Sequence, residues 1–349
     1  MQSGVELNKI YQGNALEILR SWPDELVHCV ITSPPYWGLR DYGSCDCAHY
    51  RVFEGDTTNS AANYRSGRPS PNCPKCAGTG KIKGTEKQLG LEKAPDEYIS
   101  RLVSIFREVR RVLRKDGTLW LVMGDCYMGS GVHAAHHKNP GISQSPKRGC
   151  THGVPVTEGF KPKDLVGIPW MLAFALRDDG WWLRSDIVWH KPNPMPESVR
   201  DRPTKSHEYV FLLSKSKKYY YDQDAVREIS KDPTDNRAAR EKYGKGDPHI
   251  SRLNPKTAKT YPTRNLRDVW TVTTQPFPEA HFAVYPEKLI EPCIKAGAPE
   301  GGVVLDPFMG AGTTALVARK LGRRFLGIEL NPEYIKMTEK RLNQGFLWS

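Results

Sequence analysis

A hydroxyl, two prolines and a tyrosine follow directly on the apolar run Val27–Ile31. After Thr32 the order is Ser33, Pro34, Pro35, Tyr36. The prolines fix φ and favour an extended backbone before them, so the Ser33 hydroxyl and a stiffened backbone carbonyl point beyond the end of the expected strand. Tyr36 then offers a flat face on which a planar ring can stack. Two acceptors beside an aromatic wall suit the exocyclic amine of a nucleobase, although a strand, a proline turn and an exposed tyrosine would give the same residues.

A second group of candidate residues lies near the other end of the chain. Residues 301–314 indicate a buried strand, a glycine turn and a helix that begins near Thr313. Gly310 and Gly312 allow the backbone to approach a ligand closely, and the start of the helix supplies free N–H groups. The next expected strand, residues 324–331, carries Glu329 near its end, and a carboxylate there can accept both hydroxyls of a ribose.

Two cofactors compete for this second group. A nicotinamide-binding fold also has glycines, a helix and a later acidic residue. Here the third glycine of the G-x-G-x-x-G pattern is missing, and Asp306 stands where a pyrophosphate would meet a negative charge. Asp306 suits the cationic methionine end of S-adenosylmethionine, which is therefore the expected cofactor.

Together the two motifs resemble those of the DNA methyltransferases that methylate exocyclic amines. Ser-Pro-Pro-Tyr is similar to their catalytic motif, and Asp-Pro-Phe-Met-Gly-Ala-Gly-Thr-Thr is similar to their cofactor motif. The catalytic motif comes first and the cofactor motif last, an order that marks the beta class. The resemblance implies that Ser33, Pro34, Pro35 and Tyr36 are catalytic. It also implies a set of cofactor-binding residues: Asn14, Phe282, Asp306, Phe308, Gly310, Gly312, Thr313, Glu329 and Asn331.

Position 14 departs from the family pattern, which usually has Asp there. Asn14 can still accept a hydrogen bond from the adenine amine of the cofactor. It is equally suited to be the N-cap of the helix expected after it, so both roles stay open.

The resemblance implies transfer of a methyl group from S-adenosylmethionine to the amine of a base flipped out of the DNA duplex. Ser in place of the Asp of the adenine enzymes is commoner among the cytosine-N4 members, so cytosine N4 is the expected target and adenine N6 the alternative. A catalytically silent DNA-binding protein that kept the fold is the alternative from a different class. The expected partners are double-stranded DNA and a cognate restriction endonuclease encoded separately.

The elements that must position these residues alternate between strand and helix. This alternation predicts one α/β domain over residues 1–349, with a doubly wound, mostly parallel sheet. Apolar residues at three-and-four spacing predict a helix over 97–113, ended by Gly117, before a buried strand over 118–123. Another helix is expected over 163–176, and another strand over 185–189. Segments rich in glycine, proline and polar residues predict insertions at 41–93, 127–162 and 230–262.

The charge distribution points to a polyanionic partner. The net charge is +12, and basic residues and tyrosines are interleaved within residues 215–275, where the beta class keeps its target-recognition region. A solvated basic face would explain the same charges. The expected DNA contacts are Arg237, Arg240, Arg252, Lys256, Lys259 and Arg264.

The first insertion, residues 41–93, contains candidate ligands for a structural zinc ion: Cys47, His49, Cys73 and Cys76. Tetrahedral zinc suits a small module that cannot bury a core, and free thiols are the alternative.

No apolar stretch approaches the ~18 residues of a membrane span, and the N-terminal residues form no apolar signal segment. We therefore expect a cytoplasmic protein that makes no membrane contact.

Overall fold

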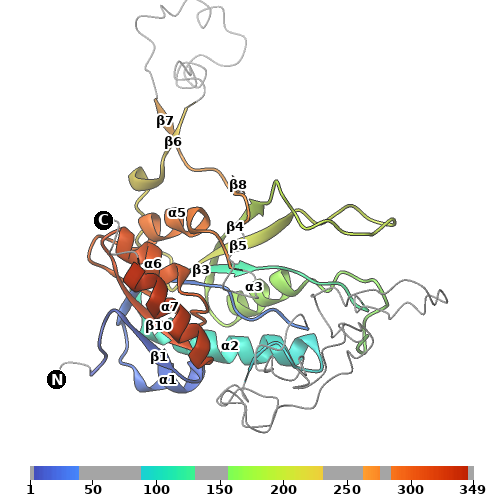
Figure 1. The fold of residues 1–349 in the computed structure, drawn as a ribbon, viewed down its shortest axis with the longest axis horizontal. Helices are drawn as coiled ribbons and strands as arrows, with labels where there is room; N and C mark the ends of the chain where they lie inside the picture. Colours follow the sequence, from blue (N-terminus) through green and yellow to red (C-terminus); the bar gives the residue numbers. More distant parts are fainter. Residues whose placement is uncertain (1–3, 39–87, 130–155, 231–261, 276–283, 345–349) are drawn as a thin grey trace, which may run out of the picture.

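An eight-stranded sheet forms the centre of the computed structural model, with strand order β1-β10-β9-β2-β3-β5-β4-β8 (Figure 1). The structure describes residues 4–38, 88–129, 156–230, 262–275 and 284–344. The strands of this sheet are β1 (Lys9–Gln12), β2 (Val27–Thr32), β3 (Leu113–Met123), β4 (Trp182–His190), β5 (His207–Ser214), β8 (Val269–Thr271), β9 (Val303–Asp306) and β10 (Arg324–Glu329). The helices are α1 (Ala15–Ser21), α2 (Pro95–Val112), α3 (Ile168–Asp178), α5 (Glu287–Gly297), α6 (Thr313–Lys320) and α7 (Pro332–Gln344), with a short 3₁₀ turn, η2 (Asp224–Val226).

Strand direction decides which residues share an edge of this sheet. Only β5 runs antiparallel to its neighbours, β3 and β4, while the other strand pairs of the sheet are parallel. The carboxyl ends of β10, β9, β2, β3 and β4 therefore lie along one edge, together with the beginning of β5. The expected mostly parallel α/β sheet is confirmed.

The two faces of the sheet carry separate core layers. Side chains of β3 alternate between them: Leu119, Leu121 and Met123 pack on one side, and Trp120 and Val122 on the other. Helices α1, α2 and α3 cover the first face, and α5, α6 and α7 cover the second (Figure 1). Ligands of such sheets bind beyond the carboxyl ends of the strands, because both faces are occupied by helices.

The expected helix end at Gly117 is wrong. Helix α2 ends at Val112, and Leu113 begins β3 at once, so Gly117 lies inside the strand. The pairing of β2 with β3 is irregular between Val27 and Cys29, and an added Cβ on Gly117 would come 2.9 Å from the His28 carbonyl oxygen. Glycine is needed at position 117 because the backbones of β2 and β3 approach closely at this bulge. In the sequence alone, a glycine at a bulge looks the same as a glycine that ends a helix.

Helix α3 begins later than expected, at Ile168 instead of residue 163. Gly167, directly before it, has a left-handed backbone with φ of 82°, and Pro169 occupies the first turn. These residues set the helix start, and the apolar pattern before them belongs to a loop. Across the described residues, no helix is long and apolar enough to cross a membrane.

Candidate active site

The two motifs that the sequence singles out meet at the carboxyl edge of the sheet. Strand β2 pairs with β9 through Cys29↔Val304 and Val30↔Leu305, so the segment after Thr32 lies beside the segment after Asp306. The Thr32 hydroxyl donates a 2.6 Å hydrogen bond to Asp306 Oδ1, across 274 positions of sequence. Candidate catalytic and cofactor residues therefore form one site.

Asp306 is the buried centre of this site, with 0% of its surface exposed. Besides Thr32, Oδ1 accepts from the Phe308 backbone N–H at 3.0 Å. The other oxygen, Oδ2, accepts from the Tyr285 hydroxyl at 2.9 Å and from the Thr314 hydroxyl at 2.8 Å. Burial raises the pKa of Asp306, and these donors act in the opposite direction by stabilising the charged form. The carboxylate thus ties together β2, β9, α6 and the segment before α5.

The glycine turn after Asp306 has the backbone form expected from the sequence. Gly310 and Gly312 have φ of 52° and 76°. An added Cβ on Gly312 would lie 2.1 Å from Thr338 Cγ2 on α7. Packing against α7 therefore requires glycine at this position, whether or not a ligand binds nearby. Thr313 follows as the first residue of α6, as predicted.

Glu329 closes the turn from the end of β10. Its Oε2 accepts from the Gly310 N–H and its Oε1 from the Asn331 N–H, each at 2.8 Å. Burial raises the pKa of Glu329 to about 7. The Asn331 side chain in turn accepts from the Glu333 N–H at 2.9 Å, which caps the start of α7. A carboxylate has about four acceptor positions, and these backbone donors do not fill all of them, so Glu329 can still accept hydrogen bonds from a ribose.

Asn14 is the N-cap of α1. Its Oδ1 accepts from the backbone N–H groups of Leu16 at 3.0 Å and Glu17 at 3.3 Å. The next residue back, Gly13, donates to the Glu329 carbonyl at 3.0 Å, so Asn14 lies beside the site. The capping role is confirmed, and contact with an adenine amine stays a prediction.

Side chains far away in the sequence hold two groups of the catalytic motif. The Tyr98 hydroxyl on α2 donates to the Pro35 carbonyl at 2.8 Å, and the Tyr36 hydroxyl donates to Glu208 Oε2 at 2.9 Å. Within the described part of the chain, by contrast, no hydrogen bond engages the Ser33 hydroxyl or the Pro34 carbonyl. Ser33 is partly buried and Pro34 is buried. These two oxygens can therefore accept hydrogen bonds from a ligand.

Sequence reasoning missed several side chains that build the site: Thr32, Tyr98, Glu208 and Tyr285. Tyr285 had a signal, since residues 281–289 resemble the family segment that closes over the methionine end of the cofactor. Glu208 lies in residues 207–211, which resemble a later block of the same family, but that resemblance gives it no partner. Tyr98 had no signal, because nothing near it in the sequence indicates that the fold brings it to the catalytic motif.

Most of the other expected site residues lie outside the part of the chain that the structure describes. The zinc ligands Cys47, His49, Cys73 and Cys76, together with Phe282, Arg237, Arg240, Arg252, Lys256 and Lys259, lie outside the described residues, and their roles stay predictions. Arg264 is described, on the small sheet of β6 (Glu228–Ile229) and β7 (Thr263–Arg264), where its guanidinium donates to Glu228 at 3.0 Å. Among the described residues, no group of three His, Cys, Asp or Glu could hold a metal ion.

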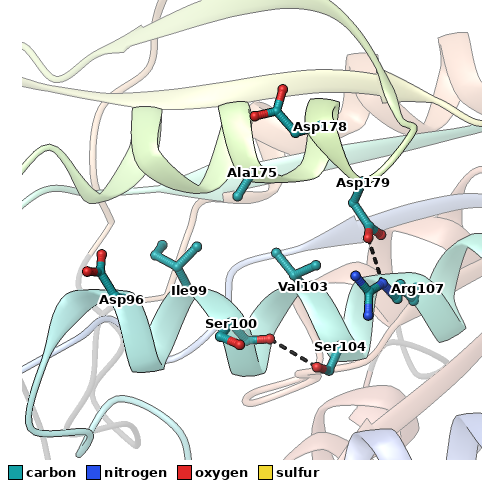
Figure 2. A pocket seen from close by; sticks show the side chains of 9 residues that line it. All are labelled: Asp96, Ile99, Ser100, Val103, Ser104, Arg107, Ala175, Asp178 and Asp179. Atoms are coloured by element: carbon teal, nitrogen blue, oxygen red, sulfur yellow. Dashed lines mark hydrogen bonds and ion pairs between the residues drawn. The ribbon is translucent and has the colours of Figure 1, made fainter.

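A hollow of about 480 Å³ lies elsewhere, between α2 and α3 (Figure 2). Asp96, Ser100 and Arg107 line it from α2, and Asp178 and Asp179 from α3 and its end. Arg107 is already paired with Asp179 at 2.6 Å. None of the candidate catalytic or cofactor residues lines this hollow, so it is separate from the site.

The fold and the joined motifs define a class of protein, the DNA methyltransferases that act on exocyclic amines. The chain belongs to the DNA methylase family of N6/N4 type, which it matches over residues 27–340. Type II methyltransferase M.Cfr9I of Citrobacter freundii is 43% identical over 342 residues, covering 97% of this chain and 89% of that protein. Type II methyltransferase M.SmaI of Serratia marcescens is 40% identical over 344 residues, covering 98% and 93%.

Solved structures share the fold. The PvuII DNA methyltransferase (cytosine-N4-specific) superposes with a TM-score of 0.57 at 17% identity, covering 98% of this chain and 92% of that one. A putative DNA modification methylase from Thermus thermophilus, complexed with S-adenosyl-L-methionine, gives a TM-score of 0.53 at 22% identity, covering 97% and 94%. The resemblance drawn from the two sequence motifs is confirmed.

Proposed function

We propose that this methyltransferase transfers the methyl group of S-adenosylmethionine to the exocyclic N4 of a cytosine flipped out of double-stranded DNA. The observation that carries the proposal is the pair of open acceptors, the Ser33 hydroxyl and the Pro34 carbonyl. Their neighbours Thr32, Pro35 and Tyr36 are all engaged by the protein. An exocyclic amine has two N–H groups to donate, and this pair offers one acceptor for each.

The amine lone pair of a nucleobase is delocalised into the ring and is a poor nucleophile. Donation of both N–H groups to Ser33 and Pro34 favours a tetrahedral nitrogen, whose lone pair is no longer delocalised into the ring. The new C–N bond would form as the S–C bond of the sulfonium breaks, with S-adenosylhomocysteine as the leaving group, and the methylated amine would lose one proton to solvent. A paired base cannot reach this site, so the target base must leave the duplex. The face of the Tyr36 ring then holds the base by stacking. Positioning of well-oriented reactants supplies ~7–11 kcal/mol of such a barrier, so the transfer needs neither a covalent intermediate nor a metal.

The residues beyond β9 and β10 fit the cofactor. The turn at Gly310 and Gly312 and the start of α6 form a backbone cradle, and Glu329 provides ribose acceptors beside it. When bound there, S-adenosylmethionine would supply an electrophilic methyl group on its sulfonium. Asp306, bonded to Thr32, keeps this cradle in register with Ser33.

The choice of base rests on Ser33. A neutral hydroxyl tolerates the ring edge of cytosine, whereas the adenine enzymes of this family use a charged Asp. Adenine N6 is the second candidate, because the hydroxyl and carbonyl would accept equally from its amine.

Nucleoside analysis tests the target directly. DNA is incubated with the protein and S-adenosylmethionine carrying a deuterated methyl group, then digested and weighed as nucleosides. Labelled N4-methylcytosine is the expected product, and labelled N6-methyladenine would move the assignment to adenine. Cofactor binding without any labelled nucleoside would instead support a silent DNA-binding protein.

The proposal extends to target recognition and biology. The chain would be a single methyltransferase domain, and its residues 215–275 would read the DNA site. The name Type II methyltransferase, carried by relatives such as M.Cfr9I, supports a cognate restriction endonuclease encoded separately, with both acting in the cytoplasm. Exchange of residues 215–275 with those of a relative should transfer the site specificity. A folded, active chimera that keeps the original site would place recognition elsewhere.

A further inference from the structure

The Tyr36 ring is anchored by a side chain far away in the sequence. Its hydroxyl donates to Glu208 Oε2 at 2.9 Å, across 172 positions. Glu208 is the second residue of β5, and because β5 runs antiparallel to β3 and β4, its beginning lies at the edge where the other strands end. The fold thereby brings a carboxylate to the catalytic motif from the one strand that begins at this edge.

The other carboxylate oxygen is occupied too. Glu208 Oε1 accepts from the ammonium of Lys191, the residue directly after β4. The Lys191 backbone N–H donates to the Ser206 carbonyl at 2.8 Å, and its Nζ lies 4.3 Å from the centroid of the Trp189 ring. Both side chains of the ion pair are only 18% exposed. Such a pair is screened little by water, so Lys191 holds the carboxyl group of Glu208 in place.

Gly124, just after β3, leaves room for this arrangement. An added Cβ there would come 2.6 Å from Tyr36 Cε2 and 3.2 Å from Glu208 Cδ. The Tyr36 backbone is also fixed, since Tyr98 holds the preceding Pro35 carbonyl. The ring is therefore restrained at its hydroxyl, along one edge and at its backbone.

We propose that Glu208, held by Lys191, is a positioning residue that fixes the Tyr36 ring in the orientation that receives the flipped base. The inference rests on the proposed function and names the part of the fold that makes the stacking surface rigid. A ring that is already ordered in the folded protein loses no conformational entropy when the base binds. The entropy of aligning the ring is therefore lost during folding and not during the reaction.

A double-mutant cycle on the shared hydrogen bond tests the inference. Glu208→Ala and Tyr36→Phe each remove the bond from one side, while the phenylalanine keeps the stacking face. Each is expected to lower the single-turnover methylation rate roughly tenfold, the effect of one hydrogen bond of ordinary strength. The double variant should be within about twofold of either single variant, because the same interaction is lost.

Three further measurements separate positioning from general damage. Dissociation constants for S-adenosylmethionine and for DNA should stay near those of wild type, so that the loss lies in the rate. Glu208→Gln should recover most of the rate, because the amide can still hydrogen-bond the tyrosine. The matched control is Glu291→Ala, which breaks a carboxylate–lysine pair with Lys295 on α5 and should leave the rate unchanged.

The assay uses the full chain, unmethylated genomic DNA and tritiated S-adenosylmethionine. Additive losses in the double variant, or a Tyr36→Phe rate equal to wild type, would overturn the inference. Should Glu208→Ala not fold, Tyr36→Phe decides the matter, because it removes the same hydrogen bond, and Glu208→Gln serves as the variant that keeps it. A wild-type protein that incorporates no label refutes the proposed function, whereas an active wild type with equally active variants refutes only the positioning role.

Discussion

Replacing Asp306 by alanine removes the acceptor for four donors inside the protein: the hydroxyls of Thr32, Tyr285 and Thr314 and the N–H of Phe308. One of these donors can recover, because the Tyr285 and Thr314 oxygens lie 2.5 Å apart and one hydroxyl can donate to the other. The second of these hydroxyls, the Thr32 hydroxyl and the Phe308 N–H keep no acceptor. Each unsatisfied buried donor costs about 1–3 kcal/mol, which gives roughly 3–9 kcal/mol for the three donors.

Part of this loss is offset, because burial raises the pKa of Asp306 and the alanine variant no longer buries a carboxylate. We therefore expect about 3 kcal/mol of destabilisation, the lower end of that range. Unfolding entropy is about 2.1 cal/mol/K per residue, so for a chain of 349 residues this loss lowers the Tm by about 4 °C.

Thermal unfolding followed by near-ultraviolet circular dichroism measures this shift, and calorimetry measures S-adenosylmethionine affinity in the same samples. Asp306→Asn keeps an acceptor for Thr32 and Phe308, so its Tm should fall by less than about half as much. If the carboxylate charge also attracts the amino end of the cofactor, Asp306→Asn should clearly weaken S-adenosylmethionine binding although its Tm falls only slightly. Asp178→Ala, on the exposed end of α3, is the control. An Asp306→Ala protein with an unchanged Tm would refute the buried network.

Other parts of the site make separate predictions. Because the pKa of Glu329 is about 7 in the free protein and the ionised form accepts ribose hydroxyls, S-adenosylmethionine affinity should weaken as pH falls below about 7, by at most tenfold per unit. In the same free protein, this raised pKa should lower the free energy of unfolding as pH rises from 4.5 to about 7. Glu329→Gln should abolish the pH dependence of both the affinity and the stability. A Glu329→Gln protein with the wild-type pH profile in calorimetry would exclude Glu329 as the source. Ser33→Ala should lower the methylation rate roughly 100-fold while cofactor affinity is kept, and a wild-type rate would exclude Ser33 from catalysis. Neutralising Lys256 and Lys259 together should flatten the salt dependence of DNA binding by roughly one unit of slope per lost phosphate contact, and an unchanged slope would remove them from the DNA interface.

Local patterns were sufficient to locate the two motifs. Strand β2, the turn at Gly310 and the start of α6 at Thr313 all follow from neighbouring residues, because apolar runs and glycines act within a few positions. The end of α2 was not predictable in the same way, because Gly117 serves a bulge against another strand. The partners of the site residues were also beyond local reasoning. Glu208 reaches Tyr36, and Tyr285 reaches Asp306, only because of the order and direction of strands in the folded sheet.

The pairing of β2 with β9 has a consequence for synthesis of the chain. β2 gains its partner β3 early, but its other edge remains open until Val303–Asp306 have left the ribosome. An unpaired edge on a buried, apolar strand is prone to wrong pairing, so the nascent chain carries this hazard through most of translation. The same arrangement acts as a safeguard, because a chain interrupted before residue 303 cannot bring its catalytic motif beside a cofactor cradle. We therefore expect no DNA methylation by chains interrupted before Val303.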